Sequence, residues 1–205
     1  MKLYLTTTFF ALAISTMSWS QIQTPAASPE QTLTQIIGLS AVSINYSRPA
    51  MRGRTIFGDL VPTNEIWRTG ANKNTTINFD SDVSVGGVAL ESGTYALYSK
   101  PSQDEWTIYF YTDSENWGLP RPWDSDKVAA QLKVAPQILI EPLESFTITI
   151  DRVTDSQATM TLAWENTAVS IPLAFDTEAA VMKSIEQTMN GPDADDYYKA
   201  AVYFL

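Results

Sequence analysis

Apolar and polar residues alternate with a period of two along most of this chain, which is the pattern of strands that bury one face. The alternation runs from Ser40 to Phe175 and is broken by turn residues at Gly86-Gly87, Ser92-Gly93 and Glu165-Asn166. Many short strands with no helical stretch of ten residues among them predict an all-β antiparallel β-sandwich, jelly-roll-like, with an eight-stranded barrel as the alternative. Strands are expected at residues 42–46, 75–79, 83–85, 94–99, 106–110, 128–134, 146–150, 158–164 and 168–175.

The composition removes several kinds of catalytic site. The chain has no Cys and no His, which rules out a Ser-His-Asp or Cys-His nucleophile, a disulfide and a thiolate metal site. A carboxylate-based hydrolase would have to use Asp59, Glu65, Asp124 or Asp126, and their spacing does not favour one. No motif indicates a cofactor or a metal site.

Acidic residues outnumber basic ones, 23 to 13, for a net charge of −10. Nucleic acid and anionic lipid are therefore not expected as partners. The charge is uneven, because residues 40–79 carry five basic and two acidic side chains, whereas residues 141–205 carry three basic and eleven acidic ones. An anionic ligand would find its positive partners in the first of these regions.

The N-terminus has the features of a secretory signal peptide at residues 1–20. Lys2 precedes an uncharged apolar run that ends in Ser18-Trp19-Ser20, which predicts cleavage before Gln21. The run of about 15 residues is shorter than a membrane-spanning helix needs, so no stable span is expected after cleavage. An uncleaved N-terminal anchor is the alternative.

The remaining chain divides into three parts: a linker at 21–39, rich in Pro, Ser, Thr and Gln, the β-sandwich domain at 40–175, and C-terminal helices at 176–205. Asp176 or Thr177 is expected to cap the first helix, and the second begins near Asp193. The second helix is apolar on most sides and needs a partner surface. Packing on the first helix is expected, with the sandwich or another subunit as alternatives.

Two loop motifs contain the candidate ligand-binding residues. The stretch 47–58 carries three arginines, whose planar guanidinium groups fit carboxylate, phosphate or sulfate. The turn at 67–76 adds a tryptophan, a fourth arginine and an asparagine. Alternatively, the arginines pair with acidic residues of the chain, and the polar groups of the turn bond to its own backbone. The candidate group is Arg48, Arg52, Arg54, Trp67, Arg68 and Asn72.

A third loop, 116–124, contains Trp117 and Trp123 with two prolines. An exposed tryptophan on a rigid loop is a common platform for sugar rings or peptide prolines. The alternative is that both tryptophans cover an edge of the core.

These motifs resemble, in their order along the chain, the signature of the DUF2911 family, a domain of unknown function in exported bacterial proteins. The resemblance implies an all-β domain exported across the inner membrane of a Gram-negative cell, periplasmic or secreted, and it brings no established activity. The chain departs from the pattern in its proline-rich loop 119–124. It also stops inside what in longer relatives looks like the start of a helical-repeat tail. The motifs are Ser47-Arg48-Pro49, Gly53 to Pro62, Trp67 to Asn72, Ser92 to Leu97, Asp104 to Thr107 and Asn116-Trp117-Gly118.

Three hypotheses for function follow. The first is a non-enzymatic binding module for a small anionic or glycan-type ligand. The alternative is an envelope structural or protein-interaction module that docks a protein partner through its C-terminal helices. A carboxylate-based hydrolase is the third.

The predicted signal peptide is tested by the N-terminus of the protein from its native host. Mass spectrometry should find the mature chain starting at or within a few residues of Gln21, because the Ser-x-Ser triplet lies just before it. An intact Met1 on the protein in the envelope fraction would contradict cleavage and favour the uncleaved anchor.

Overall fold

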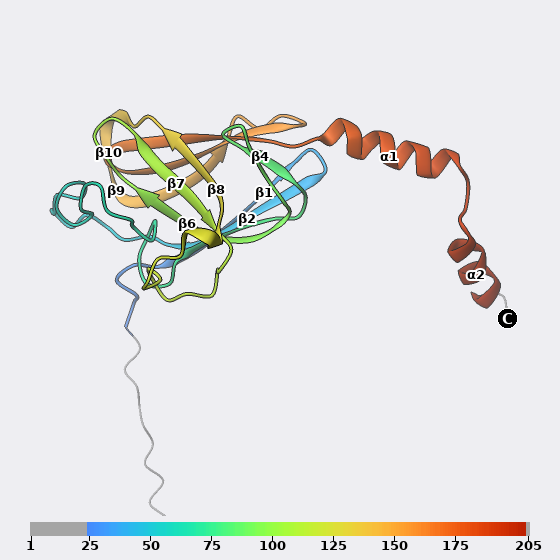
Figure 1. The fold of residues 1–205 in the computed structure, drawn as a ribbon, viewed down its shortest axis with the longest axis horizontal. Helices are drawn as coiled ribbons and strands as arrows, with labels where there is room; N and C mark the ends of the chain where they lie inside the picture. The colour runs from blue at the N-terminus through green and yellow to red at the C-terminus, as the bar shows by residue number, and fades with distance from the viewer. Residues whose placement is uncertain (1–23, 204–205) are drawn as a thin grey trace, which may run out of the picture.

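The computed structural model describes residues 24–203, so the predicted signal peptide and its cleavage site lie outside the described residues. The described chain folds into strands followed by two α-helices, which leave the sandwich at one end (Figure 1). The elements are β1 (Glu30–Ile37), β2 (Ser40–Ser47), β3 (Thr75–Phe79), β4 (Val83–Val85), β5 (Val88–Leu90), β6 (Gly93–Lys100), β7 (Trp106–Tyr111), a 3-10 turn (Ser125–Lys127), β8 (Val128–Val134), β9 (Gln137–Asp151), β10 (Gln157–Ala174), α1 (Thr177–Met189) and α2 (Ala194–Tyr203).

The strands form two antiparallel sheets that pack face to face. One sheet has the order β1-β2-β3-β6-β7-β8 and the other has the order β5-β4-β10-β9. The sheets remain separate, so the structure is a sandwich with a helical appendage, as predicted, and not the barrel that was the alternative.

The core lies between the sheets and follows the period-two pattern. Val42, Ile44 and Tyr46 of β2 are buried, while the residues between them are only half-buried. Ile148 of β9 and Ile171 of β10 belong to the same apolar cluster, from the opposite sheet. Each such side chain contributes about 1.5–3 kcal/mol when it is fully removed from water.

The predicted turn at Glu165-Asn166 is wrong, because β10 runs through it as one long strand. The pairing of β10 with β9 shifts register on both sides of Glu165, which has a φ of 52°. This is a bulge whose extra residues lie in β9, which advances four and then five residues where β10 advances two, so the pairing is distorted and β10 does not end. The Glu165 carboxylate accepts hydrogen bonds from the backbone N–H groups of Ile56 and Phe57, at 3.2 and 3.4 Å.

The predicted linker at 21–39 is also wrong over residues 30–37, which form β1. This strand pairs with the whole of β2, from Glu30 opposite Ser47 to Ile37 opposite Ser40. It is an edge strand and seven of its eight residues are exposed or half-buried. Its polar composition resembles that of a linker because an edge strand needs little apolar surface, so only the pairing reveals it.

The first helix is capped as predicted, since the Asp176 carboxylate accepts a hydrogen bond from the Ala179 N–H at 3.0 Å. The expectation that α2 packs on α1 is wrong. No residue of α1 is buried, and Tyr197 and Tyr198 of α2 are 64% and 68% exposed. The connection through Gly191 turns the chain so that α2 does not fold back along α1 (Figure 1). Within residues 24–203, no helix is long and apolar enough to cross a membrane.

Removal of residues 178–205 should leave the sandwich stable, because α1 buries no side chain. Thr177, whose hydroxyl donates to the Asp155 carbonyl oxygen at 2.7 Å, is kept. Calorimetry should find a cooperative transition and an unfolding free energy within about 1 kcal/mol of the full chain. As a control, Phe175→Ala in the shortened chain should destabilise it by about 3–5 kcal/mol, since Phe175 lies in the core. Loss of the cooperative transition on truncation alone would show that the helices belong to the domain core.

Candidate functional site

The candidate site lies on the long irregular segment 48–74, which joins β2 to β3 and loops out at the left of Figure 1. Long loops without regular structure in compact domains commonly carry function. This one is tied to both sheets by isolated bridges, Ala50 to Ser145 of β9 and Trp67 to Ser99 of β6.

Trp67 anchors the segment in the core. Its ring stacks on Trp164 with centroids 5.9 Å apart and planes 21° apart. It also meets Phe146 edge-on at 5.1 Å. Its Nε1 donates to the carbonyl oxygen of Gly70 at 3.0 Å, so both the apolar body and the polar N–H are satisfied.

The turn that follows Trp67 uses its small polar residues for its own structure. Thr69 is fully buried with a φ of 52°, and its hydroxyl lies 2.9 Å from the Ser99 hydroxyl. Gly70 has a φ of 148°, and a Cβ there would lie 3.1 Å from the Ser47 carbonyl oxygen. Asn74 donates its amide to the Ser114 carbonyl oxygen at 3.0 Å. The backbone interpretation of this turn therefore holds for Thr69, whose hydroxyl also donates to the Trp67 carbonyl oxygen at 3.4 Å, whereas Asn74 bonds to a different loop.

All four candidate arginines hydrogen-bond to backbone carbonyl groups. Arg48 donates to the Phe146 carbonyl oxygen at 3.1 Å and to the Thr147 hydroxyl at 2.8 Å. Arg52 donates to the Ala27 carbonyl oxygen at 3.0 Å. Arg54 donates to the carbonyl oxygens of its own loop, two bonds of 2.7 and 2.9 Å.

The alternative that these arginines pair with acidic side chains is wrong. Every ion pair in the part of the chain that the structure describes uses a lysine. The irregular segment has few ladder partners for its carbonyl oxygens, and buried or half-buried carbonyl groups require donors. Arg54 supplies such donors within the segment, whereas Arg48 and Arg52 donate to carbonyl groups outside it, on β9 and at Ala27.

Arg68, like Arg52, uses a single nitrogen of its guanidinium, whereas Arg48 and Arg54 each use two. The Nη1 of Arg68 donates to the Asn72 carbonyl oxygen at 2.8 Å, and within residues 24–203 no hydrogen bond or ion pair to its Nε or Nη2 is found. The face of the guanidinium rests on Gly118, where a Cβ would lie 3.0 Å from Nη1 and 3.2 Å from Cζ. Arg68 is thus positioned by the neighbouring loop and keeps one edge of its fork open.

Four of the six predicted ligand-binding residues line one cavity of about 320 Å³: Arg54, Trp67, Arg68 and Asn72. Arg48 and Arg52 are not among its lining residues. The remainder of the wall is mainly apolar and adds Ser28, Pro49, Leu60, Val61, Gly70, Ala71 and Trp164. We call this the arginine cavity. Sequence reasoning missed Trp164 and Ser28, because nothing local connects them to the turn.

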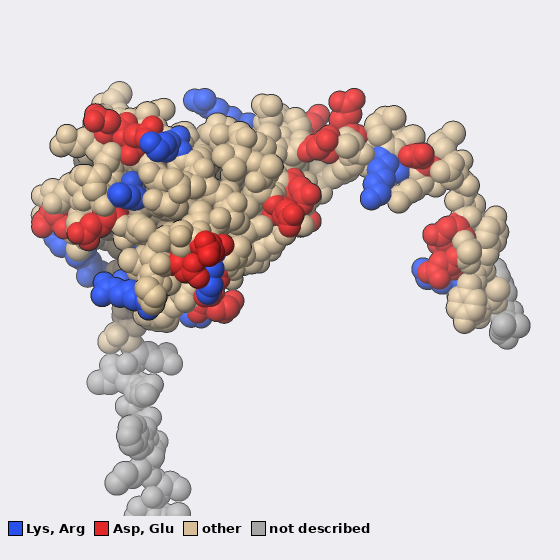
Figure 2. All heavy atoms as spheres, in the orientation of Figure 1, with Lys and Arg blue, Asp and Glu red and all other residues tan. Residues whose placement is uncertain are grey.

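The arginine cavity differs from the other cavities described here in its charge. It is lined by two arginines and by no acidic residue. The two larger cavities elsewhere contain acids: Asp82, Glu91 and Asp176 where the sandwich meets α1, and Asp193 and Asp196 between the helices. Figure 2 shows acidic side chains gathered at that junction and along the helices. In a chain of net charge −10, a cavity with this lining attracts anions selectively.

A second cavity, of about 290 Å³, adjoins the first and shares Ser28 and Asn72 with it. Its wall includes Trp117, which is 71% exposed, and the side chains of Asn45, Asn74 and Lys73. We call it the Trp117 cavity. Trp123, in contrast, packs on Tyr98 and Tyr111 and covers the outer face of the larger sheet.

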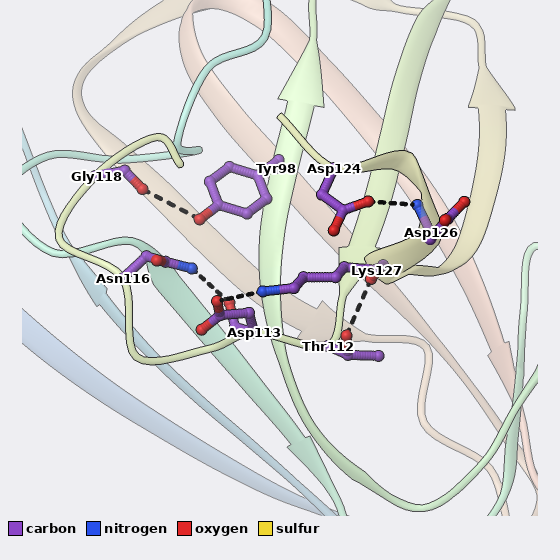
Figure 3. A network of polar contacts seen from close by, with 8 residues as sticks. All are labelled: Tyr98, Thr112, Asp113, Asn116, Gly118, Asp124, Asp126 and Lys127. Carbon is purple, nitrogen blue, oxygen red and sulfur yellow. Dashed lines mark hydrogen bonds and ion pairs between the residues drawn. The ribbon is translucent and has the colours of Figure 1, made fainter. Parts of the chain in front are cut away.

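The loop that carries Trp117 is held by a polar network (Figure 3). Tyr98 donates its hydroxyl to the Gly118 carbonyl oxygen at 3.1 Å. Lys127 donates to the Asp113 carboxylate at 3.0 Å, and the Asn116 amide donates to the Asp113 carbonyl oxygen at 2.9 Å. The ion pair holds the pKa of Asp113 below its usual value, chiefly through the hydrogen bond from Lys127.

Tyr98 is fully buried beneath this loop. Burial raises its pKa to about 12, and the nearby Tyr111 and Asp113 add to the shift. Tyr98 therefore acts as a neutral hydrogen-bond donor that fixes Gly118 against Arg68. Nothing in the local sequence marks it as part of the site.

The carboxylates considered for a hydrolase do not form a site in the described residues. Asp59, Glu65, Asp124 and Asp126 are all exposed, and none lines any of the five cavities found. Within residues 24–203, no group of three acidic side chains is arranged to hold a metal ion.

The high pKa of Tyr98 predicts a loss of stability at alkaline pH. In the unfolded chain the phenol ionises near its ordinary pKa of 10.0, whereas in the folded chain it stays protonated to about 12. The unfolded state then binds fewer protons, so the unfolding free energy falls between about pH 10 and about pH 12, by up to about 2 kcal/mol. Denaturant unfolding of the wild type and Tyr98→Phe across this range should show a steeper fall in the wild type. Equal slopes would contradict the shift.

A family model described as "Protein of unknown function (DUF2911)" matches residues 28–173, which begin two residues before β1 and end within β10. No curated protein and no solved structure matches the chain. The match covers most of the chain and all ten strands, and the Trp67 turn and the Trp117 loop both lie inside it. The chain therefore belongs to the DUF2911 family.

Proposed function

We propose that this protein is a non-enzymatic binding module that holds a small organic anion in the arginine cavity. The observation that carries the proposal is the open guanidinium edge of Arg68 in a cavity without acidic residues. Two parallel N–H groups on one edge of a guanidinium match the two oxygens of a carboxylate, and such charge-assisted bonds are the stronger ones in proteins.

The apolar part of the wall adds a second requirement. Pro49, Leu60 and Val61 line the cavity together with the rings of Trp67 and Trp164. A bare inorganic anion makes no use of such a wall, whereas an organic carboxylate places its carbon skeleton against it. Polar and apolar atoms share the exposed lining of the arginine cavity about equally, and concave sites that combine apolar walls with convergent polar groups are common for small molecules.

In this proposal Arg54 contributes positive charge to the arginine cavity and does not supply the paired N–H groups that bind the carboxylate. Its Nε and Nη2 are engaged with the loop carbonyl oxygens, so its guanidinium is held in place at the rim. Arg48 and Arg52 hold the segment to β9 and to the N-terminal residues. In this proposal they support the site and do not contact the ligand.

The proposed setting is outside the cytoplasm. Support comes from the charge and apolar run of residues 1–20 and from the absence of cysteine, which leaves folding independent of redox conditions. The periplasm and the external medium both fit.

A second candidate function is docking of a protein partner through the C-terminal helices in the cell envelope. The observation that favours it is the exposed apolar surface of α1, where Val181, Ile185 and Met189 are 39%, 50% and 81% exposed and recur every fourth residue. This role requires residues 178–205, whereas anion binding in the arginine cavity does not. The truncated chain therefore separates the two functions.

The anion proposal is tested with benzoate as the probe and benzamide as its neutral counterpart. Arg68→Gln should weaken benzoate binding by roughly ten- to a hundredfold, the equivalent of about 1.5–3 kcal/mol for a charge-assisted bond. The unfolding free energy of this variant should change by under about 1 kcal/mol, because Arg68 is in no ion pair. Calorimetric titration and chemical denaturation measure the two quantities.

Arg152→Gln is the matched control, since it removes the same charge from an exposed position that lines none of the five cavities. It should leave benzoate affinity unchanged. Equal binding of benzoate and benzamide, or wild-type affinity in Arg68→Gln, would contradict the proposal.

A further inference from the structure

The Trp117 cavity has the lining of a saccharide site. Its tryptophan is 71% exposed, although burial of an aromatic side chain of this size would contribute several kcal/mol to folding. The polar network of Figure 3 nevertheless holds the loop in one position. A large apolar ring that is fixed and left in water, in the wall of a cavity that also carries amide side chains, is suited to stack on the apolar face of a sugar ring.

The amides of this cavity are oriented as acceptors. Asn45 donates its NH₂ group to the Thr32 hydroxyl at 3.1 Å, and Asn74 donates to the Ser114 carbonyl oxygen at 3.0 Å. Asn72 donates to the Ser28 carbonyl oxygen and to the Ser47 hydroxyl, both at 3.3 Å. Within residues 24–203 no hydrogen bond to the amide oxygen of these three residues is found, so the oxygens remain available to hydroxyl donors.

The charges of the cavity complete this pattern. Glu30 and Lys73 line it, so the wall has no net charge and offers one charged acceptor and one charged donor. Neutral, hydroxyl-rich ligands suit such a wall better than anions do. The Trp117 cavity and the arginine cavity therefore select different chemical groups.

The two cavities are continuous in their walls. Ser28 and Asn72 line both, and Gly118, the residue after Trp117, rests against the Arg68 guanidinium. A ligand that occupies both must present a carboxylate at one end and a hydroxylated ring at the other. A uronic acid joined to a further sugar has this form.

We propose that the Trp117 cavity is a saccharide subsite, and that the ligand of the complete site is an acidic saccharide whose carboxylate binds at Arg68. This inference rests on the proposed function for its anionic part and is independent of it for the sugar part. Trp117 stacks on a sugar ring, and the amide oxygens of Asn45, Asn72 and Asn74 accept from its hydroxyl groups.

The test uses the full chain with three probes: digalacturonate, its dimethyl ester, which is of similar size without the charges, and benzoate. Trp117→Ala should weaken digalacturonate and dimethyl ester binding by about three- to tenfold, as expected for one lost stacking contact, and leave benzoate unchanged. Tyr198→Ala, which removes a similarly exposed aromatic ring from α2, is the control and should bind all three as the wild type does. Trp117→Phe should recover part of the lost affinity.

The outcomes separate the two proposals. Wild-type affinity for digalacturonate in Trp117→Ala, or no saccharide binding by the wild type, would overturn the saccharide subsite, while benzoate binding through Arg68 would still uphold the anion site. Equal affinity for digalacturonate and its ester, together with no benzoate binding, would overturn the anion site at Arg68. The saccharide subsite would still hold in that case if Trp117→Ala weakens the binding of digalacturonate and of its ester.

Discussion

The contact between Trp67 and Trp164 holds the irregular segment 48–74 against the core. Residues 48–74 have no ladder of their own, and the stacked pair at 5.9 Å joins them to the middle of β10. Phe57 meets both rings edge-on, and Phe146 meets Trp67 edge-on and Trp164 at a tilt. Because aromatic clusters of this size bury several hundred Å² of apolar surface, about 150–250 Å² for each ring, the loop gains the rigidity of the core. The candidate site is rigid for the same reason, since Arg68 directly follows Trp67 in the chain.

The arginines of this segment hold its irregular backbone in place by donating hydrogen bonds to carbonyl oxygens. Arg54 donates to two carbonyl oxygens of the segment itself, and Arg48 and Arg52 donate to those of Phe146 in β9 and Ala27, which holds the segment to its surroundings. A guanidinium suits this work because its five N–H groups lie in one plane and stay protonated. Arg68 has the same chemistry and, like Arg52, donates through a single nitrogen, but Arg68 lines the arginine cavity and Arg52 does not. The neighbours of each arginine thus decide its role: Arg68 lines the cavity, whereas Arg48 and Arg52 hold the segment in place.

Local patterns predicted the strands well where local physics decides them. Residues 75–79, 83–85 and 128–134 are strands with the predicted bounds, because one-sided burial imposes a period of two on any strand at the sheet surface. The Asp176 cap was predictable for a similar reason, since its hydrogen bond spans three residues. The break at Glu165-Asn166 was misread because a bulge and a turn use the same residue types, and only the pairing of β9 with β10 distinguishes them.

The sequence by itself determined three things: the candidate ligand-binding residues, the all-β sandwich fold, and the presence of a positive region in an acidic chain. Only the tertiary structure decided their roles, because the deciding contacts are distant in sequence: Arg48 meets Phe146 across 98 positions. Arg54 and Arg68 share a cavity although 14 positions separate them, and Arg52, nearly as close along the chain, lies outside it. Helix α2 shows the converse, since its apolar residues predicted a packing partner that the described chain does not provide. The pattern of residue types indicates which side chains need a hydrogen-bond or packing partner. The long-range packing of the two sheets decides which residues those partners are.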